Sequence, residues 1–175
     1  MIAFDLSLDG RDTGRDDRPM PSWSQFETAA PELAAKVRER LDAHVHKTLA
    51  TVRRDGGPRI SGTETRIEDG ELWIGSMWQA LKARDLQRDP RYALHTGSDD
   101  PPDWKGDAKL AGVAEEITDE AMVRRLNGEA AANGPSHLFR LDLSEVSHVA
   151  LHESGRAIVV TSWTPERGVR VLERA

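Results

Sequence analysis

Short stretches that alternate polar and apolar residues, separated by tight-turn residues, fill most of the sequence after residue 46. Residues 47–53 alternate and lead into a glycine-rich turn at 55–58, and a second strand is expected over 59–67. Asp69-Gly70 predicts a hairpin turn into a further strand over 71–75. Hairpins join antiparallel neighbours, whereas parallel strands need long crossovers. The sequence therefore predicts a mainly β protein with peripheral helices, whose antiparallel sheet closes into a barrel or a sandwich.

The remaining elements continue this pattern, with helices between the strands. Residues 31–41 predict an amphipathic helix, because Leu33, Val37 and Leu41 recur every four residues and Pro31 suits a first helical position. A short helical turn is expected over 22–26 and another helix over 119–126. Further strands are predicted over residues 91–96, 107–118, 137–143, 146–153, 157–163 and 169–172.

The first 20 residues differ from the rest of the chain. Residues 9–19 mix both signs of charge and have no apolar periodicity, which is typical of a flexible tail. The whole chain has 175 residues, a common size for one domain. We therefore expect a flexible N-terminal extension over residues 1–20 and a single domain over residues 21–175.

Composition excludes several kinds of partner and chemistry. The formal net charge is −6, whereas nucleic acid favours a strongly basic surface. The chain has no cysteine, which excludes disulfides, thiolate catalysis and cysteine metal sites. No apolar run is long enough to cross a bilayer, and the first residues do not resemble a secretion signal. We expect a cytoplasmic protein that acts on a small molecule, without a nucleic-acid or membrane partner.

The stretch from Ser76 to Arg91 gives the main signal for a binding site. It lies between two apolar strands, and Ser76 is expected to cap a helix that Pro90 ends. A helix N-terminus with Lys82 and Arg84 near it is a favourable place for a phosphate group. The alternative is that both cations belong to the solvated face of a short helix.

The order of these elements resembles the pyridoxamine 5'-phosphate oxidase-like family, the flavin-binding split barrels. The resemblance covers roughly residues 30–165 and is carried by Thr48-Leu49-Ala50-Thr51-Val52, Pro58-Arg59-Ile60-Ser61, Leu72-Trp73-Ile74-Gly75-Ser76 and the run K-x-R-x-L-x-x-D-P-R from Lys82 to Arg91. It implies a split antiparallel β-barrel of the FMN-binding type, which forms a homodimer with the cofactor in a groove at the interface. The implied cofactor is FMN, with a deazaflavin coenzyme as the alternative and haem as a less favoured one.

The resemblance also implies which residues hold the cofactor. They are two residues of the second strand, two at a strand end by the phosphate and two cations of the helix: Arg59, Ser61, Gly75, Ser76, Lys82 and Arg84. Arg84 has an alternative role, as the ion-pair partner of an acidic neighbour on its helix. Trp78 and Trp104 stand beside loops at the expected groove, so either ring flanks a flat cofactor or, alternatively, packs in the core or the dimer.

Two departures from the family pattern bear on function. Many members carry an arginine just before the lysine, where this chain has Ala80 and Leu81. The C-terminal segment also lacks the Arg-and-His motif of the oxidase itself, so vitamin B6 oxidation is not expected. The sequence predicts a flavin- or deazaflavin-dependent oxidoreductase of unknown substrate. The alternatives are a non-catalytic split barrel that binds flavin or another planar ligand, and a haem-binding relative.

The remaining polar residues predict no separate catalytic or metal site. His44 and His46 are two residues apart, which fits either a metal pair or surface positions. His95 is expected at the barrel rim, where it could face the groove. A haem ligand among His137, His148 and His152 is an alternative to structural roles for these residues. Glu64 is expected mid-strand, facing solvent or paired with an arginine, and we assign it no acid–base role.

Overall fold

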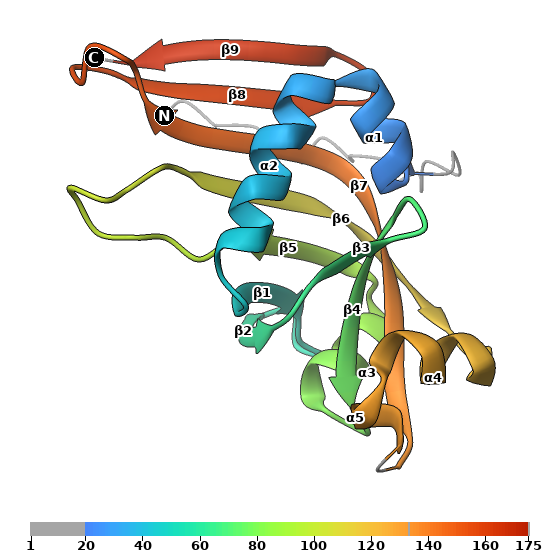
Figure 1. Ribbon diagram of the computed structural model, residues 1–175. Helices are drawn as coiled ribbons and strands as arrows, with labels where there is room; N and C mark the ends of the chain where they lie inside the picture. Colours follow the sequence, from blue (N-terminus) through green and yellow to red (C-terminus); the bar gives the residue numbers. More distant parts are fainter. Residues whose placement is uncertain (1–19, 133, 175) are drawn as a thin grey trace, which may run out of the picture.

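The computed structural model describes residues 20–132 and 134–174, over which the chain forms nine strands and five helices (Figure 1). The helices are α1 (Trp23–Ala29), α2 (Pro31–Ala43), α3 (Leu81–Arg88), α4 (Glu120–Asn127) and α5 (Glu129–Ala132). The strands are β1 (Lys47–Val52), β2 (Pro58–Thr63), β3 (Arg66–Glu68), β4 (Glu71–Met77), β5 (Arg91–His95), β6 (Asp107–Ile117), β7 (Ser136–Leu151), β8 (Ile158–Thr164) and β9 (Gly168–Arg174).

All strands belong to one antiparallel sheet, in the order β2-β1-β5-β6-β7-β4-β3. β8 pairs with the second half of β7, and β9 continues outward from β8. Within the described residues β2 and β3 form the two ends of this order and do not pair with each other, so the sheet is not closed. The prediction of a mainly β antiparallel fold with peripheral helices is confirmed, and its open order is that of a split barrel.

Strand β7 is the longest element and holds the sheet together. Its first half pairs with β4 and its second half with β8, while β6 runs along its other edge. The sequence pattern predicts two strands here, over 137–143 and 146–153. The structure has one strand instead. The polar Ser144 interrupts the sequence pattern because it is the extra residue of a β-bulge, at which the register with β6 shifts between Ala111 and Gly112. A Cβ on Gly112 would lie 1.9 Å from the carbonyl oxygen of Asp142, so the close approach requires glycine.

Two other boundary predictions are wrong. The strand expected over 59–67 is two strands, β2 and β3, interrupted at Glu64 and Thr65. The helix expected to begin after Ser76 begins at Leu81 instead, because β4 keeps pairing with β7 as far as Met77. The chain then turns at Gln79, whose φ is +58°, before α3 starts.

Helices α1 and α2 lie against the sheet, crossing β6, β7 and β8 in the view of Figure 1, and bury the core beneath them. Apolar side chains from both helices meet those of the central strands, with the largest fully buried ones being Trp23, Phe26, Leu49, Leu72, Ile74, Leu94, Leu110, Phe139, Leu141 and Leu143. The Arg38 guanidinium lies over the ring of Trp23. The ring of Phe26 packs at a tilt against that of Trp163.

The expected N-terminal extension falls on residues outside the described part, apart from Met20. Next to it, the carbonyl oxygen of Pro21 accepts a hydrogen bond of 2.8 Å from the Leu143 amide of β7. None of the helices in the described residues has the length and apolar character needed to cross a membrane.

Candidate functional site

A cavity of about 620 Å³ opens where β2, β4 and the start of α3 meet the ends of β3 and α4. Four of the residues expected to hold a cofactor line it: Gly75, Ser76, Trp78 and Lys82. Arg59, Ser61 and Arg84 are not among the lining residues. The volume falls within the range of about 300–1,000 Å³ that is usual for small-molecule sites.

Ser76 is one of the residues that line this cavity, and its hydroxyl is buried. No group in the described residues hydrogen-bonds its Oγ. A buried hydroxyl without a partner costs about 1–3 kcal/mol, so such groups are uncommon in proteins. The expected capping role of Ser76 is wrong, because the residue pairs with His137 inside the sheet and lies four positions before Ala80, the N-cap of α3. The Ser76 hydroxyl therefore keeps an unused hydrogen-bonding capacity within the described residues.

Lys82 stands in the first turn of α3 and reaches across to β2. Its Nζ donates a hydrogen bond of 2.7 Å to the carbonyl oxygen of Gly62. Burial lowers the pKa of the Lys82 ammonium, and the carboxylate of Glu64 offsets part of this change. No side chain caps α3, so its first amides lack the partner that a capping residue would supply. A cation beside an uncapped helix start is an arrangement that attracts anions.

Gly75 and Asn127 form the opposite wall of the cavity. A Cβ on Gly75 would lie 2.7 Å from Oδ1 of Asn127, so glycine lets the end of α4 approach β4. The Asn127 amide donates to Oγ of Ser136, at 2.8 Å, and to the carbonyl oxygen of His137, at 3.1 Å. This contact fixes α4 beside the cavity and leaves Oδ1 of Asn127 near the position that Gly75 keeps open.

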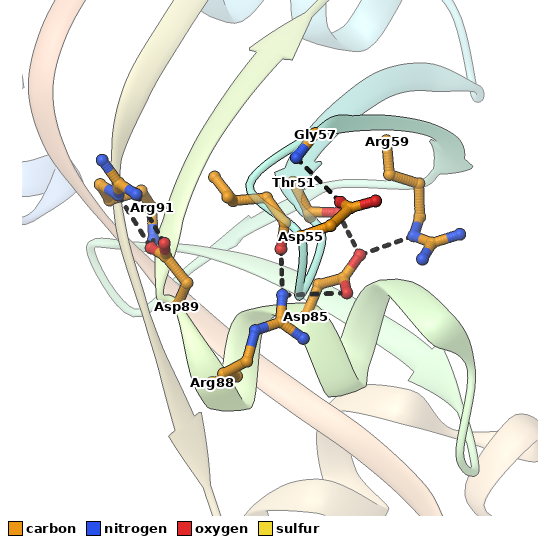
Figure 2. A network of polar contacts seen from close by, with 9 residues as sticks. Thr51, Asp55, Gly57, Arg59, Asp85, Arg88, Asp89 and Arg91 are labelled. Atoms are coloured by element: carbon orange, nitrogen blue, oxygen red, sulfur yellow. Dashed lines mark hydrogen bonds and ion pairs between the residues drawn. The ribbon is translucent and has the colours of Figure 1, made fainter.

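Arg59 is absent from the cavity wall and belongs to a network between α3 and strands β1 and β2 (Figure 2). Its Nε donates to Oδ2 of Asp85 at 2.6 Å, and the Thr51 hydroxyl donates to the same oxygen at 3.0 Å. Arg88 donates to Oδ1 of Asp85 at 3.2 Å and also to the carbonyl oxygen of Val52. Burial alone would raise the pKa of Asp85, but the hydrogen bonds from Arg59, Thr51 and Arg88 bring it below its ordinary value. This network ties α3 to β1 and β2.

The other two expected residues also have partners in the fold. Arg84 is exposed and donates to Oε1 of Gln79 at 2.6 Å, so its partner is an amide of the preceding turn and not an acidic neighbour. Ser61 lies on β2, opposite Leu49 of β1, and is half-buried. Their contribution to a cofactor stays a prediction.

Trp78 lines both the main cavity and a second one of about 400 Å³. Its ring stacks on that of His137, with 4.8 Å between centroids and 11° between planes. Nε2 of His137 accepts a hydrogen bond of 3.1 Å from the Gln79 amide, so the proton of the neutral ring is on Nδ1, which lies 2.6 Å from Oε1 of Glu116. Both ring nitrogens are thus engaged within the protein.

Large apolar side chains are exposed among the lining residues, at Met77 and Trp78, and close to lining residues in the chain, at Ile60 and Leu81. Ile60 of β2 is 75 % exposed, Met77 80 %, Trp78 54 % and Leu81 57 %. Leu81 is the residue just before Lys82, where many family members were expected to carry an arginine. Trp73 and Trp163, in contrast, are buried in the core. Trp104 lines neither cavity and donates to Asp107 at 3.2 Å.

The other histidines form separate pairs. His44 lies 3.6 Å from Asp99, His46 3.8 Å from Glu64 and His95 3.9 Å from Asp107. Among these, only His46 and its partner Glu64 line the main cavity within the described residues. The described residues contain no group of three or more histidine or acidic side chains placed to hold a metal ion.

The open antiparallel sheet with peripheral helices is the architecture of the split-barrel class of proteins. The sequence profile described as pyridoxamine 5'-phosphate oxidase matches residues 33–150. The chain belongs to the pyridoxamine 5'-phosphate oxidase family, and the resemblance noted in the sequence is confirmed. No curated protein matches the chain.

Solved structures agree with this fold. The conserved hypothetical protein Rv2991 of Mycobacterium tuberculosis is 23 % identical, with a TM-score of 0.55 over 65 % of this chain and 82 % of that one. A protein of Clostridium acetobutylicum related to general stress protein 26 is 12 % identical, with a TM-score of 0.57 over 75 % and 94 % of the two chains. The haem storage protein HutZ of Vibrio cholerae is 20 % identical, with a TM-score of 0.50 over 66 % and 89 %. At these identities the likeness concerns the fold alone.

Several residues of the site were not found from the sequence. Asn127 and Ser136 belong to no motif, and they reach the cavity only because α4 packs on β4 and β7. Gln79 and Glu116 hold His137 through contacts spanning 58 and 21 residues of chain. The left-handed turn at Gln79, a residue type that seldom adopts this conformation, carries no sequence signal.

Proposed function

We propose that this chain binds FMN, or a deazaflavin coenzyme, in the 620 Å³ cavity and works as a flavin- or deazaflavin-dependent oxidoreductase. The observation that carries the proposal is the unpartnered, buried hydroxyl of Ser76 in the same cavity as Lys82, at the uncapped start of α3. Hydroxyls, ammonium groups and helix amides are the donors that a phosphate group accepts. Family membership over residues 33–150 agrees with this ligand class.

In this proposal the protein binds and orients the coenzyme, and the coenzyme ring supplies the hydride chemistry. Ser76 and Lys82 hold the phosphate, and Trp78 offers an aromatic face at the border between the two cavities. The second cavity is where a small-molecule substrate reaches the ring, because hydride transfer needs the reacting atoms about 3–3.5 Å apart. Such a role explains a site without an evident nucleophile.

We further propose that the protein works as a homodimer with this cavity at the interface. Ile60, Met77, Trp78 and Leu81 leave apolar area exposed on or close to the lining segments, and a second copy would cover it. Sedimentation or light scattering checks the oligomeric state, and Met77→Asp with Leu81→Asp is expected to shift a dimer to monomer. A monomer in the unaltered chain contradicts this part.

A non-catalytic role is the second candidate function, and Leu81 favours it. The side chain that precedes Lys82 is apolar and exposed, so the first turn of α3 offers one cation instead of two. A helix start without that second cation holds a phosphate less strongly, which suits transient binding of flavin or of another planar ligand. Haem is a third candidate, for which His46 is the histidine that lines the cavity among the described residues.

The purified protein's visible spectrum tests these candidates, before and after separate additions of FMN, a deazaflavin coenzyme and haem, each followed by desalting. Retained flavin or deazaflavin absorption supports the proposal and identifies the coenzyme, and reduction of the bound ring by a nicotinamide donor supports catalysis. Retained flavin without turnover favours the non-catalytic role. A Soret band assigns the cavity to haem and contradicts the proposal, as does a protein that retains none of the three.

A further inference from the structure

Both ring nitrogens of His137 make contacts that join three parts of the fold beside the main cavity. His137 lies on β7 directly opposite Ser76 of β4, and its side chain is only 5 % exposed. Its Nε2 accepts a hydrogen bond of 3.1 Å from the Gln79 amide, and its Nδ1 lies 2.6 Å from Oε1 of Glu116 on β6. The ring is therefore fixed between β4, the turn that follows β4, and β6.

The turn at Gln79 sets where α3 begins relative to the end of β4. Gln79 has a φ of +58°, a conformation that residues with a Cβ seldom adopt and that persists where the surroundings hold it. The hydrogen bonds that hold it run from its amide to His137, from Arg84 to its Oε1 at 2.6 Å, and from the next amide back to the carbonyl oxygen of Met77 at 3.1 Å. The turn joins the two segments that carry the proposed phosphate donors.

The hydrogen bond from the Gln79 amide requires a neutral His137. An amide N–H only donates, so Nε2 must carry no proton, and the proton of the neutral ring is on Nδ1. Protonation places a second N–H on Nε2, opposite the N–H of Gln79, so that two donors face each other and the hydrogen bond is lost. Histidine is the residue type whose charge ordinarily changes between about pH 5 and 8, so mild acid is enough for this loss.

The contacts of the ring favour its charged form, so the turn moves and the ring stays. The Glu116 carboxylate lies next to Nδ1 and is itself held by Nε2 of Gln87, which is 3.1 Å from one of its oxygens and 2.9 Å from the other. The Trp78 ring stacks on His137, and an indole face attracts a cation. A carboxylate and an aromatic face thus hold the imidazolium, whereas the amide of the turn is repelled by it.

The other charged residues around the ring belong to α4. Glu120 and Arg124 line the second cavity together with His137, and they pair with each other at 3.0 Å. Phe139, whose ring centroid is 6.1 Å from that of His137, adds no charge. Among the described residues that line this cavity, Glu116 is therefore the charged group in direct contact with the ring.

We propose that His137 is a positioning residue that keeps the main cavity ready for its ligand while the ring is neutral. When the ring takes up a proton from solvent, the turn at Gln79 is released, and the first turn of α3 with Lys82 is no longer fixed beside Ser76. The protein thus binds a phosphate-bearing ligand in neutral solution and releases it in mild acid. The inference rests on the proposed function and adds a pH-dependent control of the same cavity.

Amide hydrogen exchange in the ligand-free protein tests whether the turn responds. We expect the protection of the Gln79 amide, corrected for the intrinsic dependence of exchange on pH, to fall about five-fold from pH 7.5 to 5.5, since one hydrogen bond is lost. His137→Gln supplies an acceptor that does not titrate, so its protection should be the same at both pH values. Glu116→Gln removes the charge that favours the imidazolium and should move the change to lower pH.

FMN affinity, measured by flavin fluorescence at the same two pH values, tests whether the ligand is released. The phosphate of FMN itself loses charge near pH 6, so every variant binds less tightly in acid. We expect the unaltered chain to lose about five-fold more affinity than His137→Gln does, for the same lost hydrogen bond. The matched control is His152→Gln, in the turn between β7 and β8, which lines neither cavity and should behave as the unaltered chain.

The two measurements separate failure of this inference from failure of the proposed function. Protection of the Gln79 amide that does not depend on pH overturns the inference and leaves the proposed function in place, as does an equal loss of FMN affinity in His137→Gln and the unaltered chain. A chain that binds no flavin at either pH overturns the proposed function and the claim of ligand release. The exchange measurement needs no ligand and still reports whether His137 controls the turn.

Discussion

The polar groups on the two sides of α3 differ in whether they have hydrogen-bond partners. On the side that faces β1 and β2, the Asp85 carboxylate receives hydrogen bonds from Thr51, Arg59 and Arg88 (Figure 2). On the side that faces the cavity, the helix start is uncapped and the neighbouring Ser76 hydroxyl has no partner among the described residues. A buried network in which every polar group has a hydrogen-bond partner stabilises a fold. Polar groups without such partners are instead sites at which a ligand can form hydrogen bonds. One short helix thus has a structural side and a side that we propose binds the ligand, called the binding side below.

Among the substitutions considered, removing the Asp85 carboxylate from the structural side should have the largest effect on the free energy of unfolding. Asp85→Ala should lower the free energy of unfolding by about 3 kcal/mol, because it leaves Arg59 and Arg88 without the buried carboxylate they share. Urea denaturation followed by circular dichroism measures the change. Glu120→Gln removes one partner of the exposed pair with Arg124 and should cost less than about 0.5 kcal/mol. Equal losses in the two variants would mean that the Asp85 network is not structural.

Acid should reduce the contribution of the Asp85 network to the free energy of unfolding. The pKa of Asp85 is below its ordinary value of 3.8 in the folded protein, so its ionised form stabilises the fold above that pH. This contribution is lost as the pH falls through the lowered folded pKa. The difference in unfolding free energy between the unaltered chain and Asp85→Asn should therefore be constant from pH 7 to about 5 and shrink below about pH 4. A difference that grows in acid would contradict the direction of the shift.

The binding side should respond in affinity instead of stability. Lys82→Ala removes the cation that α3 contributes to the cavity and should weaken FMN or deazaflavin binding by about ten-fold, since a charge-assisted hydrogen bond contributes about 1.5–3 kcal/mol. The exposed Lys109 of β6 gives the control variant Lys109→Ala, which should bind as the unaltered chain does. Fluorescence titration compares the three proteins, and unchanged affinity in Lys82→Ala would remove the phosphate assignment.

Ser76→Ala should change the stability of the fold least, so it tests whether the Ser76 hydroxyl serves ligand binding instead of folding. Removing an unpartnered buried hydroxyl should change the unfolding free energy by less than about 1 kcal/mol, in the stabilising direction. Affinity for the phosphate-bearing ligand should nevertheless fall several-fold. A clear loss of stability without a loss of affinity would show that the hydroxyl serves the fold.

The sequence predicts most of this fold because its signals are local. Asp69-Gly70 joins β3 and β4, Pro31 opens α2, and helix α3 ends just before Asp89-Pro90, as their turn and cap chemistry requires. The predicted start of α3 was wrong. Serine is a favourable N-cap residue, but Ser76 belongs to β4, because pairing with β7 extends that strand as far as Met77. Long-range pairing, which no local pattern records, outweighed a local preference.

The site was predictable only where family resemblance marks it. Lys82, Ser76, Gly75 and Trp78 lie in motifs, and the fold brings them to one cavity. Arg59 lies in a motif as well, yet its Nε is bound to Asp85. Asn127 and Glu116 reach the site through the packing of α4 and the length of β6, so their roles follow from tertiary structure alone.

The placement of β7 also governs the order in which the sheet can assemble. β1, β2 and β5 come early in the chain and can pair as they leave the ribosome, whereas the cavity edge of β4 has no strand partner until residues 136–140 are made. Domains generally fold during synthesis from the N-terminus, and long-range pairings form late. The main cavity therefore takes shape only after β1, β2 and β5 can have paired, and a nascent chain truncated before β7 should lack it.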